Sequence, residues 1–120
     1  MMRQRTGEEI DRRSSLTSNE KKAVRELKAQ LVSRFDVLDA KLFGSKARGD
    51  ATEGSDVDIM IEIAEATPET QAEIFDLIFR INLENDTFIS VVTFDRAELE
   101  EGPMSESPLY KRVQQEGISI

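Results

Sequence analysis

Residues 42–62 read LFGSKARGDATEGSDVDIMIE, and this stretch decides the fold. An apolar run over residues 37–43 stops abruptly at Gly44-Ser45, which predicts a strand followed by a tight turn. After a polar loop over residues 50–55, the sequence alternates over residues 56–63, which predicts a strand with one buried face. The apolar positions are Val57, Ile59, Ile61 and Ile63, and the alternate positions are Asp56, Asp58, Met60 and Glu62.

Helices and a further strand are predicted on both sides of this stretch. Thr17 and Glu20 have the spacing of a capping box, and apolar residues recur at helical spacing from there to about residue 34. Pro68 opens a second helix that runs to about residue 83, long enough to join parallel strands. A buried-type strand follows over residues 88–94, then a loop or short turn over 95–107 and a last helix over 108–116. The pattern indicates an α+β domain.

Composition narrows the chemistry that the chain can perform. Its 120 residues contain no cysteine and no histidine, which excludes thiol nucleophiles, imidazole bases and Cys/His zinc sites. A bound metal would therefore have oxygen ligands, as magnesium, manganese and calcium prefer. The length suits one small domain, which we place at residues 17–120, and we expect residues 1–16 to form a flexible N-terminal arm.

Charge is unevenly distributed along the chain. Residues 1–49 carry 12 basic and 7 acidic side chains, whereas residues 50–120 carry 4 and 17, and the net charge is −8. This distribution argues against direct binding of nucleic acid and is compatible with a basic partner protein or with solubility alone. No window approaches 18 uninterrupted apolar residues and no signal-peptide pattern is present, so we expect a cytoplasmic protein without a membrane span.

Two aspartates next to a glycine turn are the strongest indication of chemistry. Asp56 and Asp58 lie two residues apart on one strand face, with Cα atoms about 6.6 Å apart. Their carboxylates repel each other, and a hard cation that bridges phosphate oxygens would relieve the repulsion. Gly44 permits close approach of the backbone to a phosphate, and the Ser45 hydroxyl can bind an anion. The alternative is an ordinary turn beside the solvated face of an amphipathic strand.

The spacing of these residues resembles a known family. Gly-Ser, a ten-residue spacer and Asp-x-Asp are the core motif of the minimal nucleotidyltransferases of the DNA polymerase β superfamily. The resemblance implies a small mixed β-sheet flanked by helices. It implies that Gly44 and Ser45 hold the nucleotide phosphates and that Asp56 and Asp58 ligate two magnesium (or manganese) ions. The expected reaction is transfer of a nucleoside monophosphate, AMP from ATP being the first choice, to a hydroxyl with release of pyrophosphate.

One expected carboxylate is missing from this pattern. Active members carry a third acid on the strand after the crossover helix, and Ser90 stands at that position here. Asp95 and Asp86, which flank the strand, are the alternatives for a third ligand, with Asp95 preferred. Without the third acid the metal site is weaker and the general base is lost.

Other side chains are assigned from their positions. Lys46 and Arg48 are candidates for contact with the triphosphate, since the resemblance makes basic residues usual there, or are solvated loop charges. Phe75 and Phe79 lie four residues apart on the second helix and are predicted to be core residues.

Two functions remain open from the sequence. The first is a metal-dependent nucleotidyltransferase, and the resemblance implies a small helical HEPN-type toxin as partner, with this chain as its antitoxin. The second is a nucleotidyltransferase-fold binding module that has lost turnover and neutralises its partner by forming a complex. The paired aspartates favour the first, and the acid-free strand over residues 88–94 favours the second.

Overall fold

A mixed sheet forms the centre of the molecule. A computed structural model of the protein describes residues 14–52 and 54–120. Within these residues the strands have the order β3-β2-β1-β4. β1 is antiparallel to β2 and to β4, whereas β2 and β3 are parallel, so the predicted small mixed sheet of an α+β fold is confirmed. The strands are β1 (Val37–Phe43), β2 (Val57–Ile63), β3 (Ile89–Asp95) and β4 (Ile118–Ser119).

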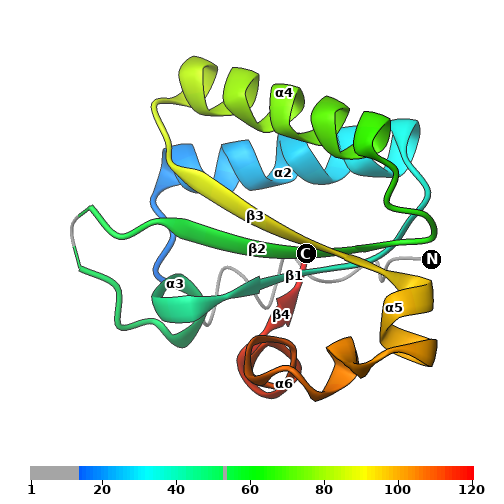
Figure 1. Ribbon diagram of the computed structural model, residues 1–120. Helices are drawn as coiled ribbons and strands as arrows, with labels where there is room; N and C mark the ends of the chain where they lie inside the picture. The colour runs from blue at the N-terminus through cyan, green and yellow to red at the C-terminus, as the bar shows by residue number, and fades with distance from the viewer. Residues whose placement is uncertain (1–13, 53) are drawn as a thin grey trace.

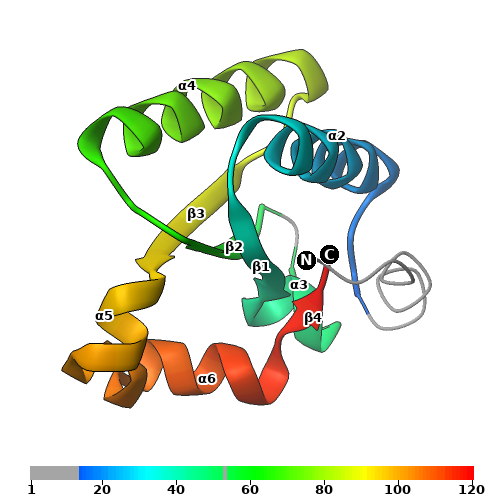
Figure 2. The same ribbon diagram turned by 90° about the vertical axis from the view of Figure 1, so that its right-hand side faces the viewer.

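Helices cover both faces of the sheet. α2 (Ser18–Arg34) and α4 (Pro68–Asn85) lie side by side over one face (Figure 1). Figure 2 shows α6 (Pro108–Glu116) on the opposite side, together with α5 (Arg96–Glu101). The short α3 (Gly44–Arg48) follows β1 directly. A 3₁₀ helix, η1 (Pro103–Glu106), joins α5 to α6.

The helix starts agree with their local sequence. The Thr17 hydroxyl accepts a hydrogen bond from the Glu20 amide at 3.2 Å, and Glu20 Oε1 accepts one from the Thr17 amide at 2.9 Å, which confirms the capping box. Thr67 caps α4, whose first residue is Pro68, and Asp86 ends the helix with a φ of 54°. α4 connects the parallel strands β2 and β3, and its predicted length was sufficient for such a connection.

The main core lies between the sheet and the pair α2 and α4. Its central members are β2 residues and the inward faces of the two helices: Ala23, Val24, Leu27, Leu31, Val57, Ile59, Ile61, Ile63, Ile74, Leu77, Ile78 and Ile81. A smaller cluster of Met60, Phe94 and Val113 fills the opposite face. The sequence placed Met60 on the polar side of its strand, but α6 covers that face, so β2 is buried on both sides at its middle.

The structure corrects the prediction that Phe75 and Phe79 are core residues. Both rings are exposed, because α4 contacts the core through a different arc that carries Ile74, Leu77, Ile78 and Ile81. The helix is apolar over a wider arc than its contact with the sheet can bury.

Residues 96–106 also differ from the predicted loop, since they form α5 and η1. Asp95 begins α5 by accepting a hydrogen bond from the Ala97 amide at 2.8 Å. The six residues of α5 are too few for an apolar period to be recognised in the sequence.

The boundary of the predicted N-terminal arm is also revised. Residues 1–13 lie outside the described residues, but Leu16 belongs to the main core and the Ser15 amide donates to the Lys46 carbonyl at 2.9 Å. Residues 14–16 are therefore part of the domain. Among the described residues, none of the helices has the length and apolar character needed to cross a membrane.

Candidate functional site

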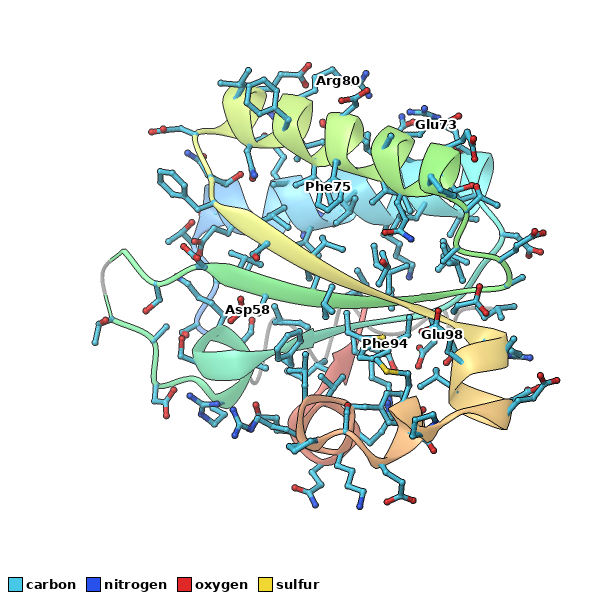
Figure 3. All side chains as sticks on the ribbon, in the orientation of Figure 1. Asp58, Glu73, Phe75, Arg80, Phe94 and Glu98 are labelled. Atoms are coloured by element: carbon cyan, nitrogen blue, oxygen red, sulfur yellow. The ribbon has the colours of Figure 1, made fainter. Side chains whose placement is uncertain are left out.

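The register of β1 and β2 brings Gly44 to Asp58. Phe43 pairs with Asp58 across the two antiparallel strands, so Gly44, the next residue, begins α3 directly beside the Asp58 side chain. Gly44 has a φ of +76°, and a Cβ atom at this position would lie 2.5 Å from Asp58 Oδ2. Only glycine accommodates both the backbone conformation and this close approach. Figure 3 shows Asp58 beside α3.

The two aspartates are held in unequal surroundings. Asp56 precedes β2 and is exposed, whereas Asp58 is the second residue of β2 and is half-buried. Burial raises the pKa of the Asp58 carboxyl above its usual range, and the neighbouring charge of Asp56 raises it further, while Arg48 partly offsets both effects. The positive charge of Arg48 therefore does not fully balance the negative charge of the Asp58 carboxylate.

Arg48 and the Gly44 amide both contact a carboxylate that the sequence did not reveal. Glu116, the last residue of α6, accepts hydrogen bonds from the Gly44 amide at 3.2 Å and from Arg48 Nη1 at 3.2 and 3.3 Å. Arg48 Nε also donates to Asp50 at 3.2 Å. Ser45, the second residue of α3, lies partly exposed next to these groups. Glu116 lies 68 residues from Arg48 in the chain, so no sequence spacing indicated this contact.

Lys46 lies in neither of the two environments predicted for it, which were contact with the triphosphate and exposure to solvent. Its side chain is buried, and its ammonium lies 2.9 Å from Glu20 Oε1, the same oxygen that accepts from the Thr17 amide. The side chain is thus neither a solvated loop charge nor directed at a phosphate. It connects α3 to the first turn of α2 through a buried ion pair.

The parallel register of β2 and β3 shows where Ser90 and Asp95, two of the positions considered for a third metal ligand, lie relative to Asp58. Ser90 pairs with Asp58, so it lies beside Asp58 on the neighbouring strand, and its side chain is exposed. Asp95 pairs with Ile63 at the far end of the same strand, about 16 Å from Ser90. Its carboxylate accepts hydrogen bonds from the Ala66 and Ala97 amides, each at 2.8 Å.

The structure therefore corrects the alternative that Asp95 is a third metal ligand. Hydrogen bonds from backbone amides lower the pKa of its carboxyl, as expected for a helix-capping aspartate. The Glu62 carboxylate, farther along β2, forms an ion pair of its own: it accepts a hydrogen bond from Arg96 Nε at 3.0 Å.

The donor set at this corner fits a divalent cation of the magnesium type. Within residues 14–52 and 54–120, no group of three or more acidic side chains is positioned to share an ion, so Asp56 and Asp58 stand as a pair. Magnesium is commonly bound by one or two carboxylates, with water and substrate phosphates completing its shell. A half-buried carboxylate with a raised pKa next to a second acid is a site that such a cation would stabilise.

Comparison with known proteins identifies the fold family. The family model described as "Nucleotidyltransferase domain" matches residues 24–117, which include the whole corner from Gly44 to Asp58. The chain belongs to the nucleotidyltransferase domain family. The resemblance seen in the sequence is thereby confirmed, and the chain is a minimal nucleotidyltransferase.

Two individual relatives agree with this assignment. A protein of Methanocaldococcus jannaschii named "Putative protein adenylyltransferase MJ1379" is 41% identical over 58 residues, which cover 48% of this chain and 58% of that relative's length. The crystal structure of a putative nucleotidyltransferase from Sulfolobus solfataricus matches 99% of this chain and 89% of its own, with a TM-score of 0.53 and 18% identity. The match to the Sulfolobus structure shows that this chain and that protein have the same fold.

Proposed function

We propose that this nucleotidyltransferase transfers AMP from ATP to a hydroxyl group in a reaction that depends on magnesium or manganese. The observation that carries the proposal is the close approach of Gly44 to the Asp58 carboxylate, with Asp56 beside it. Half-burial of an uncompensated carboxylate costs stability, and a metal-dependent site explains why the chain tolerates that cost. The name of the Methanocaldococcus relative supports a protein as the source of the hydroxyl.

The roles of the residues follow from their positions. Asp56 and Asp58 would hold the divalent ion, which supplies positive charge for the phosphate oxygens. Gly44 and Ser45, at the start of α3, would contact a phosphate once the Glu116 carboxylate leaves the Gly44 amide. Arg48 would lie beside the same phosphates if its contacts with Glu116 and Asp50 open.

The overall reaction forms a bond between the acceptor oxygen and the α-phosphorus of ATP. The bond from that phosphorus to the bridging oxygen breaks, and pyrophosphate leaves with the bonding electrons. The proton of the acceptor hydroxyl passes to solvent, because Ser90 offers no carboxylate to receive it.

The exposed Ser90 beside Asp58 favours a second candidate function. A nucleotidyltransferase fold with two metal ligands instead of three can bind nucleotide yet turn over slowly or not at all. Such a chain would act as a cytoplasmic antitoxin that neutralises a small helical HEPN-type toxin by forming a complex. In the first function the same partner would supply the hydroxyl and be modified.

The two functions differ in whether label is transferred. The chain and a candidate helical partner are incubated with ATP labelled at the α-phosphate, with and without Mn²⁺, and a parallel sample receives ATP labelled at the γ-phosphate. Metal-dependent labelling from the α-phosphate alone supports transfer of AMP. A stable complex without label supports the binding module, and labelling from the γ-phosphate contradicts the proposed reaction.

Ser90→Asp provides the complementary test, because it places a carboxylate beside Asp58. We expect this variant to raise the rate of labelling at least about tenfold if the missing acid limits turnover, since general bases contribute 10² or more. Ser90→Asn, which adds similar volume without charge, serves as the control. Equal rates in both variants would contradict the assigned position of the third acid.

A further inference from the structure

An apolar stripe runs along α4 on the surface of the domain. Phe75, Phe79 and Leu83 recur every four residues, and these residues are 62%, 67% and 69% exposed. Phe88, in the turn before β3, is 69% exposed. We call these four residues the α4 stripe. Figure 3 shows Phe75 and Arg80 on this helix.

The stripe is large for an unpartnered surface. A buried aromatic side chain contributes about 150–250 Å², so at these exposed fractions the four side chains present roughly 500 Å². This is at the upper end of the apolar patches of monomeric proteins, which are often functional. It is also a substantial part of the ~800 Å² that each partner buries in a standard protein interface. Phe79, Leu83 and Phe88 also line a hollow of about 340 Å³.

The side chains around the α4 stripe are mostly acidic, which favours a basic partner. α4 and the following turn carry five acidic side chains and one basic side chain, Arg80, whose Nε lies 3.9 Å from Glu84 Oε1. The acidic residues are Glu69, Glu73, Asp76, Glu84 and Asp86. A second copy of this chain would bring the same acidic border and a net charge of −8, so like charges oppose self-association through this face.

We propose that the α4 stripe is the docking surface for a basic amphipathic helix of a partner protein. Residues at i, i+4 and i+8 form the ridge that packs into the groove of a second helix. Lysine and arginine on the borders of that helix would face the acidic border of α4. The proposal goes beyond nucleotidyl transfer, because docking on α4 requires neither metal nor turnover.

One end of the stripe is joined to the start of β2. The Val57 amide donates to the Phe88 carbonyl at 2.9 Å, which fixes the end of the stripe to the start of β2 between Asp56 and Asp58. Phe88 precedes Ser90 by two residues. Phe88 is therefore the part of the stripe nearest the start of β2, whereas the Asp58 side chain lies on the opposite face of the sheet, beside α3.

The test uses a labelled 18-residue helical peptide with leucine at i, i+4, i+8 and i+11 and lysine at the flanking positions. Its binding to the full chain is measured by fluorescence anisotropy, beside a matched peptide with glutamate in place of lysine and a lysine-rich peptide with serine in place of leucine. We expect binding of the first peptide at least tenfold tighter than of either control. Equal binding of the lysine-serine peptide would overturn the proposal, since charge alone would then explain the affinity.

Variants of the chain locate the binding surface. Phe75→Ser/Phe79→Ser/Leu83→Ser is expected to lose at least tenfold in affinity without loss of Tm, because these side chains are exposed. Leu109→Ser changes an exposed leucine on α6 and is expected to bind as the unmodified chain does. Unchanged affinity in the triple variant would overturn the proposal.

Two further outcomes separate the alternatives. If sedimentation shows a dimer that the triple variant abolishes, the occupant is a second copy and the proposal is wrong. Asp56→Asn/Asp58→Asn is expected to bind the peptide normally, so loss of the nucleotidyl transfer function and loss of docking are distinguishable. Loss of peptide binding in this variant would contradict docking on α4.

Discussion

Replacing Asp58 with asparagine is expected to stabilise the protein in metal-free buffer at neutral pH. The carboxylate is half-buried and lies near Asp56, and both effects raise its pKa in the folded chain. A raised pKa means that the folded state binds the proton more tightly than the unfolded state does. The ionised form therefore costs stability, and the neutral amide removes that cost.

The magnitude follows from the spacing of the two acids. The Cα atoms of residues two apart along an extended strand are about 6.6 Å apart, and we take about 7 Å for the distance between the two charged carboxylates. Two unit charges at this distance repel by ~2.4 kcal/mol at an effective dielectric constant of 20 and by ~0.6 kcal/mol in water. Because Asp56 is exposed and Arg48 offsets part of the repulsion, we expect a gain of about 1 kcal/mol. For 120 residues this corresponds to a rise in Tm of roughly 4 °C.

Thermal unfolding followed by circular dichroism in EDTA measures this change. Asp76→Asn, which removes an exposed acid on α4, is the control and is expected to shift the Tm by less. The advantage of Asp58→Asn should be largest above the raised pKa and should vanish as the pH falls below the ordinary carboxyl range, where Asp58 is protonated in both states. A lower Tm for Asp58→Asn at pH 7, or a gain that grows at low pH, would refute the reasoning.

Two other substitutions test the packing around the site. Gly44→Ala is expected to lower the free energy of unfolding by at least about 1–2 kcal/mol, because φ is +76° and the new Cβ would meet Asp58 Oδ2; unchanged urea denaturation would contradict the close approach. Lys46→Met leaves the largely buried Glu20 carboxylate without its cationic partner and with only the Thr17 amide as donor, and it is expected to cost about 3 kcal/mol. The double variant Lys46→Met/Glu20→Gln should recover part of that loss, and a double variant less stable than the single would contradict the ion-pair assignment.

Local sequence features were sufficient for the elements that form the site. The capping box at Thr17, the alternation after Asp56 and the glycine at the end of β1 each depend on neighbours a few residues away. The alternation also predicted that Asp56 and Asp58 share one face of their strand. The resemblance, and no local pattern, assigned Ser90 to the position of the third acid, and the parallel register places Ser90 opposite Asp58.

Long-range contacts could not be read in the same way. Met60 alternates with polar residues, yet α6 buries it, and no local pattern indicates which helix covers which face. Glu116 reaches Gly44 and Arg48 only because α6 packs at the end of β1. Phe79 obeys helical spacing and was predicted to be buried, since periodicity shows an apolar face without showing what covers it.

The most direct test of the account is calorimetric titration of the chain with α,β-methylene-ATP, which binds without transfer of AMP. We expect binding that requires Mg²⁺ or Mn²⁺ and that weakens at least tenfold in Asp56→Asn/Asp58→Asn, while Asp76→Asn binds as the unmodified chain does. Nucleotide binding that is equal in EDTA, or that survives intact in the double variant, would contradict the assignment of Asp56 and Asp58 as the metal ligands of this nucleotidyltransferase.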